Sequence, residues 1–127
     1  MTQRTILFRG KRIDNGEWVE GSYFECDQMH FIIGNQQPQT EVDPATVGQF
    51  IGLTGKNEKQ IFDGDVVKFI DANSKPIPFS EFTTEIVWWN EFSRFTLKNT
   101  HTELSFLESD DMEVIGNIFD NPELLPK

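Results

Sequence analysis

The sequence of 127 residues contains a single cysteine, Cys26, and no hydrophobic run near the roughly 20 residues that a membrane-spanning helix needs. One cysteine excludes an intrachain disulfide, and the first residues lack the apolar core of a signal peptide, so we expect a cytoplasmic protein. Basic residues are also scarce: the chain has 11 basic and 21 acidic side chains, which give a net charge of −10. Such a surface repels phosphate backbones and anionic lipid, which disfavours membrane association and nonspecific nucleic-acid binding.

Motifs for catalysis and for metal or nucleotide binding are missing as well. The two histidines, His30 and His101, stand alone on predicted strand or turn segments, and Cys26 has no C-x-x-C partner. These three residues cannot form a structural zinc site, and residues 63–67 continue into an apolar run rather than an EF-hand loop. The glycines of residues 48–52 lie in a β-type segment with no helix to bind phosphate. We therefore expect no enzyme activity, no cofactor and no metal.

Aromatic residues are abundant instead: 12 Phe, three Trp and one Tyr make up 13% of the chain. They occur in short segments rich in Phe, Ile, Val, Trp and Thr, which Gly and Pro separate at short intervals. This spacing is typical of an all-β protein, a sandwich or a small barrel, and no segment has the 3.6-residue apolar period of a long helix. Residues 34–40 are polar and form the main linker candidate, so we predict two regions, 1–41 and 42–127.

The turn residues set the limits of the predicted strands. Residues 14–16, 26–28 and 63–65 are turn sequences, and 71–82 is predicted as an irregular loop because Pro76 and Pro78 cannot both lie in a paired strand. The predicted strands, in chain order, are 5–8, 17–21, 23–25, 30–33, 49–53, 66–70, 84–89, 94–98, 103–107 and 113–118.

Strand 84–89 is apolar on both faces, with Ile86 and Trp88 on one face and Val87 and Trp89 on the other. We predict that Ile86 and Trp88 point into a barrel, next to Val67, Phe69, Phe95 and Leu97. Trp89 then points outward, toward the N-terminal region or a partner.

The candidate interaction surface consists of Trp89, Phe92 and Arg94. An aromatic cluster of this kind also stacks nucleobases in some small β-barrels. Here, however, Arg94 is the one base near Glu85 and Glu91, so no groove that follows a nucleic-acid backbone is evident.

Five groups of residues resemble, in the same order, the YopX-like proteins of phages and prophages. They are Phe8–Lys11 with Gly16–Gly21, Val42–Leu53, Asn57–Val67, Ile86–Trp88 with Phe95, and Glu113–Leu125. The resemblance implies an N-terminal β-hairpin region followed by a C-terminal SH3-like barrel, an origin in a phage or prophage, and self-association. It brings no activity, catalytic residue or cofactor.

Several residues of these groups have architectural interpretations. Asp43 accepts hydrogen bonds at the start of a short helical turn, and Pro44 suits the first position of that turn. Pro122 ends the last strand, because it has no N–H for the ladder. The full set of predicted structural residues is Asp43, Pro44, Gly48, Gly64, Asp65, Gly116 and Pro122.

Two hypotheses about function follow. The first is a non-enzymatic accessory protein that binds a protein partner, including a second copy of itself, through the barrel and its aromatic face. The second is a nucleic-acid-linked regulator. It would bind nucleic acid through the aromatic face and the basic strand around residues 9–12, or act as an acidic DNA mimic that occupies the DNA site of a basic host protein.

Overall fold

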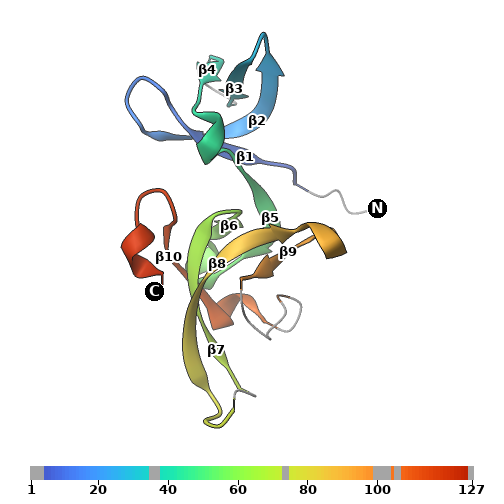
Figure 1. Cartoon of the computed structure of the whole chain (residues 1–127), viewed down its shortest axis with the longest axis vertical. Helices are drawn as coiled ribbons and strands as arrows, with labels where there is room; N and C mark the ends of the chain where they lie inside the picture. Colours follow the sequence, from blue (N-terminus) through green and yellow to red (C-terminus); the bar gives the residue numbers. More distant parts are fainter. Residues whose placement is uncertain (1–4, 35–37, 73–74, 99–103, 105–106, 126–127) are drawn as a thin grey trace. The chain divides into compact units, whose positions relative to one another are not determined.

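The computed structural model describes residues 5–34, 38–72, 75–98, 104 and 107–125, and it is all-β, as predicted (Figure 1). All helical elements of these residues are short 3-10 turns, labelled η. No helix of the described residues is long and apolar enough to cross a membrane. The chain divides into two compact units, residues 1–52 and 53–127, which are described separately.

The first unit is an antiparallel sheet with the strand order β4-β3-β2-β1-β5. Its elements are β1 (Phe8–Lys11), β2 (Trp18–Cys26), β3 (Met29–Ile33), β4 (Thr40–Glu41), η1 (Pro44–Thr46) and β5 (Gly48–Thr54), of which β5 ends in the second unit.

The core of the first unit consists of three buried side chains, Val19, Ile32 and Val42, against which Phe8, Tyr23 and Val47 pack. Val42 belongs to this core and Val47 packs against it, and the compact unit extends to Gly52. The first strand starts later than predicted. It spans Phe8–Lys11 instead of 5–8, because its pairing with β2 begins at Phe8 and continues to Lys11.

The second unit contains an antiparallel sheet with the order β10-β7-β8-β9. Its strands are β6 (Gln60–Phe62), β7 (Asp65–Asp71), β8 (Ser80–Trp89), β9 (Arg94–Leu97) and β10 (Met112–Asn117), and its turns are η2 (Lys56–Glu58), η3 (Asn90–Phe92), η5 (Ser109–Asp111) and η6 (Pro122–Leu124). The buried core is formed by Ile61, Phe62, Val66, Val67, Phe69, Ile86, Leu97 and Met112. Among the described residues this sheet stays open and does not close into the expected barrel.

Two strand limits in the second unit differ from the prediction. β8 begins at Ser80, inside the predicted loop, because it pairs with β7 as far as Asp71. The predicted strand 103–107 lies largely outside the described residues, and Leu104 and Leu107, the two that are described, are not in a strand.

The predicted structural residues lie at turns, at the first residues of strands and at one bulge. The carboxylate of Asp43 accepts a hydrogen bond of 3.0 Å from the Ala45 amide, and Pro44 begins η1. The buried Asp65 carboxylate accepts one of 2.8 Å from the Phe62 amide. Gly48 pairs with Arg9, and Gly64 has a φ of +90°. Gly116 lies at a bulge in β10, and Pro122 begins η6.

Candidate functional site

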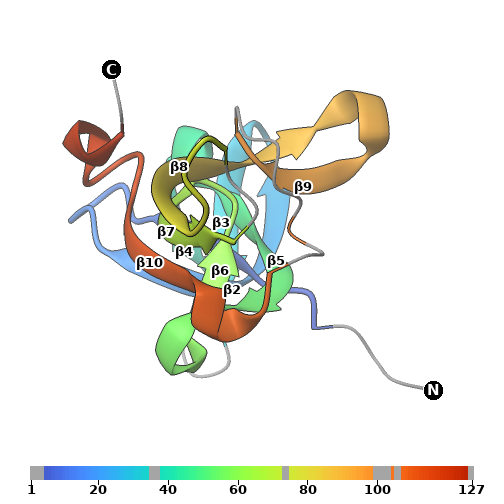
Figure 2. The same cartoon turned by 90° about the horizontal axis from the view of Figure 1, so that it is seen from below.

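The ends of β8 and β9, with the turn η3 that joins them, carry a group of aromatic side chains. We call Trp88, Trp89, Phe92, Arg94 and Phe95 the aromatic arm. Trp88 pairs with Phe95 and Trp89 with Arg94 across the two strands, and the turn is closed by Ser93 in the left-handed conformation. In Figure 2 this hairpin, drawn in orange, extends outward from the rest of the sheet.

The two faces of the arm each hold one pair of rings. On one face Trp88 and Phe95 meet edge to face with ring centroids 5.0 Å apart, and the indole N–H of Trp88 donates to the side-chain oxygen of Asn90 at 2.8 Å. On the other, Trp89 and Phe92 are 4.3 Å apart. The guanidinium of Arg94 lies 5.5 Å from each of these two rings. Edge-to-face pairs and stacked cations of this kind hold the rings in defined positions.

The arm is exposed, which corrects one prediction. Ile86 is fully buried, as predicted, but Trp88, on the same face of β8, is 48% exposed, so its predicted position inside a barrel is wrong. The reason is the register of the sheet. The pairing of β7 with β8 ends where Val66 faces Glu85, so beyond Ile86 the strand β8 has only β9 beside it. Trp89, predicted to point outward, and Phe92, predicted as part of the interaction surface, are 38% and 58% exposed.

Charges on the arm nearly balance. Glu91 lies exposed in η3, and Arg94 stacks on the rings of the chain itself. Farther along the hairpin, Lys98 forms an ion pair of 3.8 Å with Glu85. The arm therefore presents apolar aromatic surface with little net charge, unlike the basic groove that follows a nucleic-acid backbone.

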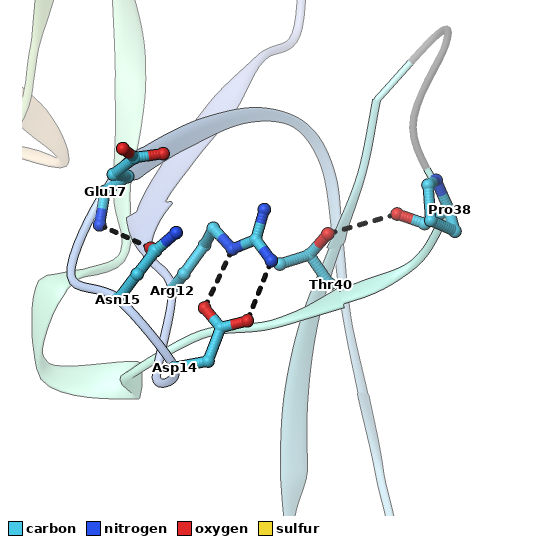
Figure 3. Close-up of polar contacts among 6 residues, drawn as sticks. All are labelled: Arg12, Asp14, Asn15, Glu17, Pro38 and Thr40. Atoms are coloured by element: carbon cyan, nitrogen blue, oxygen red, sulfur yellow. Dashed lines mark hydrogen bonds and ion pairs between the residues drawn. The ribbon is translucent and has the colours of Figure 1, made fainter.

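A second candidate, in the first unit, is a hollow of about 410 Å³ lined by residues 12–14 and 38–41. The guanidinium of Arg12 donates two hydrogen bonds, of 2.9 and 2.8 Å, to the carboxylate of Asp14 (Figure 3). These bonds raise the pKa of Arg12 and lower the pKa of Asp14 from their usual values. The charges of Arg12 and Asp14 neutralise each other, and the lining holds one further charged residue, Glu41, so the hollow brings no group of like charges together for a ligand.

One polar contact of the first unit is not evident from the sequence. His30 stands alone in the sequence, but the β2–β3 register brings its Nδ1 within 2.6 Å of the Tyr23 hydroxyl, with the two rings stacked. Cys26 is exposed at the end of β2, and His101 lies outside the described residues. No group of three or more His, Cys, Asp or Glu among the described residues could hold a metal ion.

Two antiparallel sheets, short 3-10 turns and an aromatic hairpin define a small all-β protein with two units. Within that class the chain belongs to the YopX family: the family model described as YopX protein matches residues 7–126. This match confirms the resemblance on which the sequence analysis relied.

The structure is also similar to the crystal structure of protein EF1440 from Enterococcus faecalis. The TM-score is 0.62, the sequence identity is 24%, and the match covers 98% of this chain and 100% of that chain. At this identity the likeness shows the fold alone. No curated protein matches the chain.

Proposed function

We propose that this protein is a non-enzymatic interaction module of the phage or prophage type, which acts in the bacterial cytoplasm and uses the aromatic arm as its contact surface. One observation carries the proposal: Trp88, Trp89 and Phe92 stay between 38% and 58% exposed at the end of a single hairpin. Contiguous exposed apolar side chains mark interaction sites, and tryptophan is enriched among the residues that dominate binding energy.

The fixed positions of the rings in the arm support the same proposal. The hydrogen bond from Trp88 to Asn90 and the stacking of Arg94 fix the rings before any partner arrives, so little side-chain entropy is lost on binding. Trp89 is 38% exposed, and an indole N–H can donate to a carbonyl of the partner.

A binding experiment with matched variants tests the proposal. The double variant Trp89→Ser/Phe92→Ser removes the arm's apolar surface. Its control, Ile6→Ser/Ile13→Ser, removes two side chains of similar exposure, 59% and 57%, in the other unit. Proteins captured from the source cells are identified and their binding is remeasured with purified components. We expect at least a tenfold loss for the arm variant and none for the control. Equal binding by the arm variant and the wild type contradicts the proposal.

The exposure of Trp88 favours a second candidate function, direct binding of single-stranded nucleic acid, because exposed indole rings stack on bases of any sequence. Fluorescence anisotropy with a labelled oligonucleotide tests it: binding has to weaken steeply between 50 and 200 mM salt and be lost in the arm variant. In the DNA-mimic form of this hypothesis the protein binds no DNA. Instead, residues 53–127, with 14 acidic and seven basic side chains, compete with DNA for a basic protein.

A further inference from the structure

We infer that the open edge of β2, at Tyr23 and Glu25, binds an extended segment of a partner protein as an additional strand. The segment that fits is one in which basic and apolar residues alternate, with a basic side chain opposite Glu25. This edge belongs to the first unit, whereas the aromatic arm belongs to the second, so the inference goes beyond the function proposed for the arm.

The strand β2 has neighbours on both sides along only part of its length. β1 pairs with β2 only as far as Gly21, so from Ser22 to Cys26 the one paired neighbour among the described residues is β3. Figure 1 shows the β2–β3 hairpin continuing past β1. An edge of this kind presents backbone N–H and C=O groups and is a template for a further strand.

The turn of the hairpin determines which backbone groups face the open edge. It consists of two residues, Asp27 and Gln28, which both have positive φ and which join the paired residues Cys26 and Met29. The residues next to a two-residue turn of this type exchange both of their backbone hydrogen bonds. Bonded and non-bonded pairs then alternate along the two strands.

By this alternation the amide of Phe24 bonds to β3, whereas the N–H and C=O groups of Tyr23 and Glu25 point to the open edge. The far edge of β3 follows the same pattern. There the carbonyl of His30, which pairs with Glu25, accepts a hydrogen bond of 2.9 Å from the Val42 amide. Tyr23 and Glu25 thus offer two donors and two acceptors in the arrangement that one extended segment can bind.

The outer face of the hairpin is apolar. On it Phe24 and Phe31 stack with ring centroids 5.1 Å apart, and Met29 and Ile33 are 41% and 43% exposed. This face is opposite to the core of the first unit, because Ile32, between Phe31 and Ile33, is buried in that core. An added strand places every second side chain beside this face, so apolar residues fit at those positions.

Charge determines the other residues of the segment. From residue 13 to residue 55 the sequence has seven acidic side chains, at positions 14, 17, 20, 25, 27, 41 and 43, and no Lys or Arg. Glu25 lies exposed on the open edge, and Asp27 lies exposed in the turn beside it. Directly opposite residues of an antiparallel pair attract each other if their charges are opposite and repel each other if their charges are alike. A basic residue opposite Glu25 therefore fits, and an acidic one does not.

A synthetic peptide tests the inference. The probe is fluorescein-labelled Lys-Val-Lys-Val-Lys-Val-Lys, which in an extended conformation has its lysines on one face and its valines on the other. Fluorescence anisotropy measures its affinity with protein titrated to about 1 mM, since so small an interface binds weakly. Glu25→Lys should weaken binding at least tenfold. The control Glu123→Lys makes the same charge change at an exposed residue of the second unit and should leave binding unchanged.

Two further measurements distinguish strand addition from general attraction between opposite charges. N-methylation of the lysine backbone nitrogens removes the donors that face β2 and keeps the charge, so it should abolish binding. N-methylation of the valine nitrogens, which face away from β2, should leave binding intact. Hydrogen exchange followed by NMR should show the amides of Tyr23 and Glu25 exchanging at least tenfold more slowly with saturating peptide. The amide of Phe24, already bonded to β3, should exchange slowly with and without peptide.

Four results overturn the inference: no binding of the lysine peptide, equal binding by Glu25→Lys and the wild type, equal binding of the two N-methylated peptides, or unchanged exchange at Tyr23 and Glu25. Circular dichroism of Glu25→Lys excludes unfolding as the cause of a lost contact. The arm variant Trp89→Ser/Phe92→Ser should bind the peptide like the wild type, and a loss in that variant would place the peptide on the arm instead. The proposed function of the arm and this inference therefore fail in different experiments.

Discussion

The middle of β8 and its two ends have similar sequences but different surroundings. Thr84 and Ile86, in the middle, are 8% and 0% exposed. Thr84 pairs with Val67 of β7, and Ile86 pairs with Leu97 of β9. Phe82 and Trp88, two residues away in either direction, are 41% and 48% exposed. An apolar pattern along a strand thus predicts burial only where neighbouring strands extend as far. Where they end, the same residue types are exposed.

The largest expected effect is in the middle of the strand. Ile86→Ala removes a fully buried side chain and should lower the free energy of unfolding by about 2–5 kcal/mol. Ile70→Ala is the matched control, because Ile70 is 47% exposed on the neighbouring β7, and it should cost less than about 1 kcal/mol. Urea unfolding followed by circular dichroism measures both. If both variants lose the same free energy of unfolding, the middle of β8 is no more important for stability than the exposed positions of the sheet.

A smaller loss is expected for the buried hydroxyl of Thr84. It donates to the carbonyl of Lys98 at 2.6 Å, so Thr84→Val leaves that carbonyl without this donor and should cost about 1–2 kcal/mol. Thr83→Val, at the adjacent half-buried position, is the control and should change stability by less than about 0.5 kcal/mol. The same unfolding experiment compares the two, and a stable Thr84→Val variant shows that the bond contributes little.

At the end of the strand, Trp88→Ala should cost only about 0.5–1.5 kcal/mol, mainly through its edge-to-face contact with Phe95. A tryptophan buried in a core would cost about 3–5 kcal/mol instead. Thermal unfolding of Trp88→Ala beside Ile86→Ala separates the two cases. A loss as large as that of Ile86→Ala would show that Trp88 is part of the core after all.

The contrast between the middle and the ends of β8 shows how far the sequence determines the fold. Turn chemistry and alternation predicted the all-β class, the helical turn at Pro44, the strands β7, β9 and β10 and the second half of β8, because Gly, Pro and Asp act on their nearest neighbours, whereas β6 was not predicted. The position of Trp88 depends on where β7 stops pairing with β8. Where this pairing ends depends on both β7 and β8, so it cannot be predicted from the pattern of residues 84–89 alone.

The candidate site was predictable to a similar extent. Trp89, Phe92 and Arg94 are close in sequence, and the structure brings them together in one hairpin. The exposure of Ile77 and Phe79 was not predicted, because Pro76 and Pro78 predicted an irregular loop but not which side chains that loop exposes. The signal available was Ile77 and Phe79 themselves, two large hydrophobic residues in a segment with too many prolines to pair in a sheet.

The smallest expected effect concerns Arg94, whose guanidinium lies over Trp89 and Phe92. An exposed cation–π contact contributes about 0.5–1 kcal/mol, so Arg94→Gln should lower stability by no more than that. The control is Lys98→Gln, which also removes one positive charge, but from an ion pair with Glu85 rather than from the rings. Arg94→Gln should change tryptophan emission, since Trp89 loses its stacked cation, whereas Lys98→Gln should leave emission unchanged. If Arg94→Gln instead destabilises the protein as much as Thr84→Val, the arm is an integral part of the folded sheet, and the ends of β8 are not energetically separate from its middle.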